Sequence, residues 1–222
     1  DEAHRAGADI AKFQFFDISE YFGPEFEWYE ECMKARIDYD KAEMLRDYCD
    51  KVGIEFMSSV FNLQGVEWAE KLGMKRYKIA SRCIGQQDLF DAVGETGKDM
   101  IVSLGMWHDA NPTAPLPTHI KSKGKVDFLY CVAKYPTMPE DVDFDKIDFK
   151  DKYSGFSDHT IGMNAPLIAV ARGARILEKH FTLSKKMHGP DHQGSMEPNE
   201  LRQLVKSARE FEEFMSKWNT ES

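Results

Sequence analysis

The sequence of 222 residues has no long apolar run, no excess of basic residues and no CxxC pair. Without an apolar stretch of about 20 residues, or a basic segment leading into one, we expect neither a membrane span nor a signal peptide. The net charge of −9 argues against a general nucleic-acid binder, which would normally present a basic face. Four scattered cysteines indicate reduced thiols, as in a cytoplasmic protein.

What the sequence does contain is a repeated alternation of apolar strand and amphipathic helix. Such alternation with short connections predicts a parallel sheet, and near-continuous apolar runs such as MIVSLG suit strands covered on both faces. Strands are predicted at 8–16, 54–61, 74–81, 99–105, 126–133, 153–159 and 175–181. Helices are predicted at 41–53, 65–73, 86–97, 165–174 and 198–217.

The fold that this pattern predicts is a (β/α)8 TIM barrel in one domain, 1–222. Residues 2–7 resemble the tail of a helix, so we infer that a first strand preceded residue 1 and is absent from this chain. Three prolines break 106–125, which we interpret as a degenerate unit, and 17–40 predicts a long aromatic and acidic loop at the barrel mouth. A doubly wound open sheet is the alternative, but no glycine-rich phosphate loop follows the first strand.

Polar side chains gather where the predicted strands end, which is where parallel barrels hold their chemistry. Strand side chains that only packed a core would usually be apolar. Each polar residue alone also fits a structural role, a lysine pairing with a carboxylate or a serine bonding the backbone. Together they predict a ring that binds phosphate and carboxylate. Its members are Lys12, Gln14, Ser58, Ser59, Lys78, Ser81, Ser103, Tyr135, Ser157, His159 and His180.

Two of these residues, His159 and His180, end successive strands, and neighbouring strands lie about 4.8 Å apart. Imidazoles so placed can converge on one metal ion. Two nitrogens leave coordination positions for water and substrate oxygens, as in a catalytic rather than a structural site. The alternative interpretation is a pair of structural histidines.

Seven motifs in this order resemble the sialic acid synthase family, including its members in spore-coat polysaccharide biosynthesis. They are KFQ (12–14), KIAS (78–81), SLGM (103–106), YPTMPEDV (135–142), GFSDHTIG (155–162), EKHFTL (178–183) and GPDHQGSMEPNEL (189–201). The resemblance implies a cytoplasmic transferase that condenses phosphoenolpyruvate with N-acetylmannosamine or a related amino sugar, and a homodimer. It also implies a divalent ion, usually Mn²⁺ with Mg²⁺ possible. We expect this chain to be the barrel domain alone, without the family's small C-terminal antifreeze-like domain.

The same resemblance assigns roles to individual residues. It implies metal ligation by His159 and His180, and catalytic roles for Lys12, Lys78 and Tyr135. It implies substrate binding by Lys12, Gln14, Ser59, Lys78, Ser81, Ser103, Tyr135, Ser157 and Asp191.

Where the family usually continues KIAS with glycine and glutamate, this chain has Arg82 and Cys83. Our hypothesis is that Arg82 adapts the pocket to a different, anionic acceptor. The alternative is a surface arginine beside a site of drifted specificity. Cys83 is either a reactive thiol activated by nearby cations or a buried inert one.

Two functions fit the sequence. The first is a phosphoenolpyruvate-condensing synthase of a nonulosonic, sialic-type acid. The second is a catalytically impaired barrel that binds such anions and a metal in a binding or regulatory role.

Overall fold

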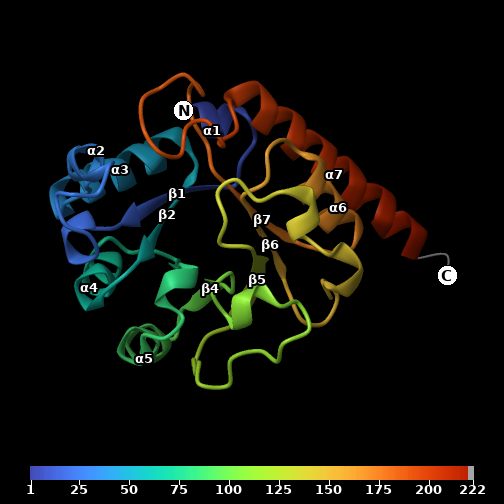
Figure 1. Cartoon of the computed structure of the whole chain (residues 1–222), viewed down its shortest axis with the longest axis horizontal. Coiled ribbons are helices and arrows are strands. Elements are labelled where there is room, and N and C mark those ends of the chain that lie inside the picture. Colours follow the sequence, from blue (N-terminus) through green and yellow to red (C-terminus); the bar gives the residue numbers. More distant parts are fainter. Residues whose placement is uncertain (220–222) are drawn as a thin grey trace.

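The computed structural model describes residues 1–219 and contains one sheet of seven parallel strands in sequential order (Figure 1). All seven predicted strands are confirmed. They are β1 (Ile10–Phe15), β2 (Glu55–Val60), β3 (Arg76–Ile79), β4 (Asp99–Ser103), β5 (Val126–Cys131), β6 (Gly155–Asp158) and β7 (Ile176–Lys179).

Helices surround the sheet on its outer side, as Figure 1 shows for α3, α4 and α5 along one side and α6 and α7 along the other. The α-helices are α1 (Glu2–Arg5), α2 (Tyr29–Ala35), α3 (Tyr39–Val52), α4 (Leu63–Lys71), α5 (Gln87–Glu95), α6 (Asn164–Ala171) and α7 (Pro198–Asn219). Short 3₁₀ turns are η1 (Ile18–Glu20), η2 (Ser81–Cys83), η3 (His108–Ala110), η4 (Pro139–Asp141) and η5 (Phe144–Lys146). None of the described helices has the length and apolarity needed to cross a membrane.

The five predicted helices are confirmed, but α3, α4 and α6 begin earlier than the apolar periodicity indicated. Asp38 caps α3 by accepting a hydrogen bond from the Lys41 amide, and Asn62 caps α4 through the Gly65 amide. Such caps satisfy amides that the first helical turn leaves unpaired, so the cap residue sets the start. Gly53 ends α3 in the left-handed conformation, with φ of 86°, as its position predicted.

The prediction of a loop over 17–40 is wrong in part, because η1 and α2 lie inside it. The sequence of α2 fits the helix dipole: Glu30 and Glu31 occupy its first turn and Lys34 its last. The proline-broken segment 106–125 contains η3 and no α-helix. Its interpretation as a degenerate barrel unit stays a prediction.

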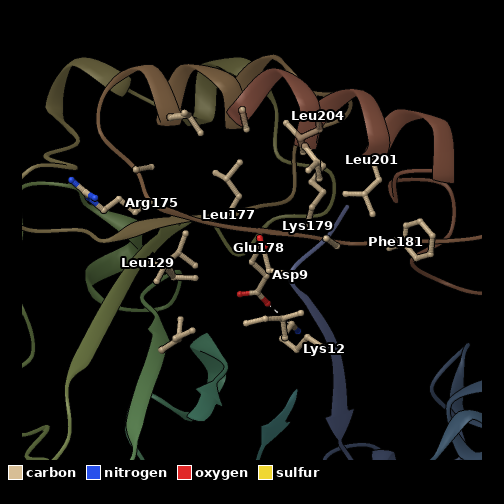
Figure 2. Close-up of a pocket in the computed structure, with 18 of the residues that line it drawn as sticks. Asp9, Lys12, Leu129, Arg175, Leu177, Glu178, Lys179, Phe181, Leu201 and Leu204 are labelled. Atoms are coloured by element: carbon tan, nitrogen blue, oxygen red, sulfur yellow. Dashed lines mark ion pairs between the residues drawn. The ribbon is translucent and has the colours of Figure 1, made fainter. Parts of the chain in front are cut away.

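The sheet curls until its two outer strands face each other. No backbone pairing joins β1 and β7 in the described chain, yet Lys12 Nζ of β1 lies 2.9 Å from Glu178 Oε1 of β7. A cavity of about 1990 Å³ opens beside this contact and extends into the interior of the sheet. Figure 2 shows Leu201 and Leu204 of α7 above it, with Glu178 turned toward Lys12. The inferred first strand stays a prediction.

Candidate active site

The interior of the curled sheet holds two lysines around one carboxylate. Lys12 Nζ lies 2.9 Å from Glu178 Oε1, and Lys78 Nζ of β3 lies 3.3 Å from Glu178 Oε2. Strand periodicity turns alternate residues to the same face, so these three side chains meet although they come from three strands. The group carries a formal net charge of +1. A surplus positive charge in a cavity is an electrostatic site for an anion.

Burial sets the electrostatics of this group. Lys78 is only 2% exposed, and loss of hydration lowers the pKa of its ammonium group while Glu178 opposes the shift. Its Nζ donates to Ser103 Oγ at 2.8 Å and to the Ile79 carbonyl at 3.1 Å. Burial raises the pKa of Glu178, but the charges of Lys12 and Lys78 outweigh it and hold the carboxyl well below its usual range.

A row of small polar groups follows the lysines around the sheet. Ser81 Oγ accepts a hydrogen bond from the Gly105 amide at 2.9 Å and lies 3.7 Å from Cys131 Sγ. Strand register places Ser157 beside Cys131. Gly105 is required here, because a Cβ at that position would come within 2.8 Å of Cys131 Sγ. Strand register places Ser59 beside Lys78. The structure therefore brings together the predicted lysines and the other predicted serines, but not Ser58. Ser58 alternates with Ser59, so its buried side chain turns to the outer face of the sheet, and its prediction as a member of the ring is wrong.

The second group lies where β6 and β7 end. The ring centroids of His159 and His180 are 5.4 Å apart, and the Tyr135 ring is 4.1 Å from the first and 5.9 Å from the second. The expectation that the two imidazoles lie close together is confirmed. Gln14 is beside Ser59 in the register of β1 and β2 and lines the cavity that also reaches His180.

The chemistry of these histidines fits a metal ligand. His159 Nδ1 lies 2.7 Å from the Val132 carbonyl, so this nitrogen carries the hydrogen and Nε2 keeps a free lone pair. Burial lowers the pKa of both imidazoles and favours the neutral, metal-binding form. Asp191 Oδ2 is 3.8 Å from His180 Nδ1.

The coordination set is incomplete by itself. Within residues 1–219, no group of three or more histidine, cysteine or carboxylate side chains is arranged to hold a metal ion. An ion held by the two imidazoles would have to take its other ligands from water or substrate. The imidazoles do not form a closed structural site.

Glu178 is the site residue that the sequence analysis missed. It lies within the motif EKHF and two positions before His180, so strand periodicity turns both side chains to the interior. The intervening Lys179 points to the other face, where it forms a buried ion pair with Asp158 at 2.6 Å. Counting back by two from the histidine would have identified Glu178.

Arg82 follows Ser81 in η2, with its guanidinium over aromatic rings of the segment that follows β1. Its neighbour Cys83 is fully buried, and burial raises the pKa of this thiol to about 11 despite the opposing charges of Arg82 and Lys78. Of the two interpretations of Cys83, the structure favours the inert buried thiol.

The chain is similar to known proteins over almost its whole length. The sequence model of the NeuB family matches residues 1–220. The chain belongs to the NeuB family. It is 32% identical over 233 residues to the N,N'-diacetyllegionaminic acid synthase of Legionella pneumophila, covering 95% of this chain. It is 31% identical over 225 residues to the human N-acetylneuraminate-9-phosphate synthase, covering 93% of this chain. The chain spans 65% and 63% of the length of these two relatives.

A solved structure shares the fold of this NeuB-family chain. The N-acetylneuraminic acid synthetase of Leptospira borgpetersenii, crystallised with citrate, superposes with a TM-score of 0.85 at 30% identity. The alignment covers 96% of this chain and 76% of that protein. The resemblance to sialic acid synthases is therefore confirmed.

Proposed function

We propose that this chain condenses phosphoenolpyruvate with an N-acetylmannosamine-like amino sugar to give a nonulosonic acid and inorganic phosphate. The observation that carries the proposal is the position of the two lysines. Lys12 and Lys78 share one carboxylate, which leaves a surplus positive charge in the same interior that opens toward His180. Phosphoenolpyruvate carries a phosphate and a carboxylate, so its charge is complementary to this cavity.

In this proposal, different residues bind the two substrates at two ends of the cavity. Lys12 and Lys78 hold the anionic groups of phosphoenolpyruvate, and Ser81, Ser103 and Ser157 offer hydroxyl donors nearby. A new carbon–carbon bond joins C3 of phosphoenolpyruvate to the sugar aldehyde. Water adds at C2, and the C2–phosphate oxygen bond breaks to release phosphate. The fixed lysine charges stabilise the phosphate as its charge grows.

His159 and His180 are the residues that would hold a divalent cation, Mn²⁺ or Mg²⁺, which when bound polarises the aldehyde of the open-chain sugar. Tyr135 packs against both imidazoles and closes one side of this region. Gln14, Ser59 and Asp191 complete the proposed substrate contacts. Manganese binding, followed by electron paramagnetic resonance of Mn²⁺, tests the assignment: we expect the H159Q and H180Q variants to lose it.

The proposed reaction is tested by phosphate release from the full chain. We expect release that requires phosphoenolpyruvate, an amino sugar and Mn²⁺ together, and a rate about 10²–10³-fold lower in Lys78→Met, as for loss of a charge-stabilising donor. Ser103→Ala, which removes the hydroxyl that Lys78 contacts at 2.8 Å, provides a milder variant that keeps the ion pairs. Lys123→Met, at an exposed ion pair, is the matched control and should retain the rate.

A binding protein without turnover is the second candidate, because Arg82 and Cys83 stand where the family usually has glycine and glutamate. If the chain binds phosphoenolpyruvate and Mn²⁺ but releases no phosphate, the synthase proposal is wrong and the binding protein is supported. Cytoplasmic location and a homodimer belong to the same proposal and rest on the family resemblance alone.

A further inference from the structure

Arg82 is a cation without a counter-ion at the mouth of the sheet. Among the described residues, no carboxylate lies within ion-pair distance of it and no side chain or carbonyl accepts a hydrogen bond from it. The protein has 38 acidic residues against 29 basic ones, and ion pairs engage many of its other arginines, including Arg36 and Arg76. An arginine left without such a partner keeps its full charge and all five N–H donors for a ligand.

The position of this guanidinium is fixed by stacking. Its central carbon lies 5.5 Å from the Phe16 ring centroid, 5.1 Å from that of Tyr21 and 5.7 Å from that of Phe22. Phe16 and Tyr21 stack on each other with ring centroids 5.0 Å apart, and Phe22 stacks on Phe26 at 4.6 Å. Aromatic faces attract the cation, but they do not accept its in-plane hydrogen bonds. The rings of Phe16, Tyr21 and Phe22, the aromatic platform, therefore orient the guanidinium, and the N–H groups at the edge of the guanidinium stay available to a ligand.

Arg82 follows β3, whereas His159 and His180 lie at the ends of β6 and β7. Parallel strands end at the same edge of the sheet, so the guanidinium and the imidazoles share one mouth, and the curl of the sheet places them across it from each other. Tyr135 follows β5 at this mouth, and its ring centroid lies 4.1 Å from that of His159. If an open-chain sugar lay with its aldehyde beside the histidines, the end remote from the aldehyde would point across the mouth toward β3.

We propose that Arg82 is a specificity-determining residue that binds an anionic group, a phosphate or a carboxylate, at the end of the acceptor sugar remote from its aldehyde. A planar guanidinium forms two parallel hydrogen bonds with either group. The inference rests on the proposed synthase function for the orientation of the sugar. Binding of the anionic group by Arg82 does not require catalytic turnover.

The test compares N-acetylmannosamine with its 6-phosphate by isothermal titration and by phosphate release. We expect the wild-type chain to prefer the phosphorylated sugar and Arg82→Gln to reduce this preference at least tenfold, the usual effect of losing a charge-assisted hydrogen bond. Arg82→Lys keeps the charge without the paired donors and should recover part of the preference. Phe22→Leu weakens the platform and should lower the preference less than Arg82→Gln.

A matched control is Arg202→Gln on α7, where the arginine contacts Asn199 on the surface, and it should leave the preference unchanged. Equal affinity of the wild-type chain for the two sugars would overturn the inference. An equal loss of affinity for both sugars in Arg82→Gln would also overturn it, because that result would show a general structural role for Arg82. If no sugar supports phosphate release, the synthase proposal fails, while the titrations still decide the role of Arg82.

Discussion

The Glu178 carboxylate lies between two lysines in the interior of the sheet. Its two oxygens face Lys12 and Lys78 at 2.9 and 3.3 Å, and Oε2 accepts no hydrogen bond within the described structure. The buried ammonium group of Lys78 and the half-buried one of Lys12 repel each other, and the carboxylate between them offsets this repulsion. Glu178 therefore allows an anion-binding pair of lysines to exist before any anion arrives.

Replacing this carboxylate by an amide should expose its role. We expect Glu178→Gln to lower the free energy of unfolding by about 3–5 kcal/mol, the usual result of removing one member of a buried ion pair. Added inorganic phosphate should stabilise the variant more than the wild-type chain, since the lysines then lack their internal counter-charge. Urea unfolding with and without phosphate measures both effects.

The control for this variant is Glu95→Gln, whose carboxylate pairs with Lys123 in solvent and whose loss should change stability by less than about 0.5 kcal/mol. Unchanged stability of Glu178→Gln would show that the lysines do not depend on this carboxylate.

At the scale of elements, strand β6 and the residues after it show how one short segment serves both faces of the sheet. Ser157 and His159 face the interior, while Asp158, 1% exposed, faces outward and pairs with Lys179 of β7. This outward pair fixes β7 against β6 in the register that aligns Ser157 with Glu178. A slip of one residue would turn every inward side chain outward.

Helix α5 contacts the segment before β5 through a glycine. A Cβ at Gly94 would collide with the Lys121 carbonyl oxygen. Alanine normally stabilises a helix by about 1 kcal/mol relative to glycine, but overpacking typically costs about 1–3 kcal/mol. We therefore expect Gly94→Ala to lower the free energy of unfolding by roughly 1–2 kcal/mol in denaturant unfolding.

Gly85→Ala is the matched control for the α5 variant, because a Cβ there would meet no atom within 4 Å. It should leave stability within about 1 kcal/mol of the wild-type value. A stabilised Gly94→Ala would contradict close packing between α5 and the 121–122 backbone.

Over the whole molecule, ion pairs between helices and strands make stability depend on pH. Glu70 of α4 accepts Lys98 Nζ at 2.7 Å and the Tyr77 hydroxyl of β3 at 2.6 Å. Burial raises the pKa of Glu70, but these two hydrogen bonds outweigh it and hold the pKa below its ordinary value of 4.5. A depressed carboxyl pKa stabilises the folded chain above that value, and the contribution is lost as the pH falls through the folded-state pKa.

We therefore expect Glu70→Gln to be less stable than the wild-type chain at pH 7, with a difference that shrinks as the pH falls below about 4.5. Urea unfolding at a series of pH values measures the difference. Glu67→Gln on the same helix, whose carboxylate contacts Lys71 in solvent, is the control and should show little pH-dependent difference. A constant difference from pH 7 to 3 would exclude the ionisation of Glu70 as its cause.

The sequence by itself determined the seven strands, the five longer helices and most of the polar residues that face the interior. These follow from local rules: a strand alternates its faces every second residue and an amphipathic helix repeats every 3.6. Neighbouring parallel strands end at the same edge of a sheet. The sequence therefore also predicts that His159 and His180, which follow two neighbouring strands, lie close together.

Only the tertiary structure decided what those residues contact. The curl of the sheet brings Lys12 of the first strand to Glu178 of the last, and it extends Arg82 over the rings of Phe16 and Tyr21. No local pattern contains these contacts, because their partners lie far apart in the chain and meet through the summed twist of all seven strands.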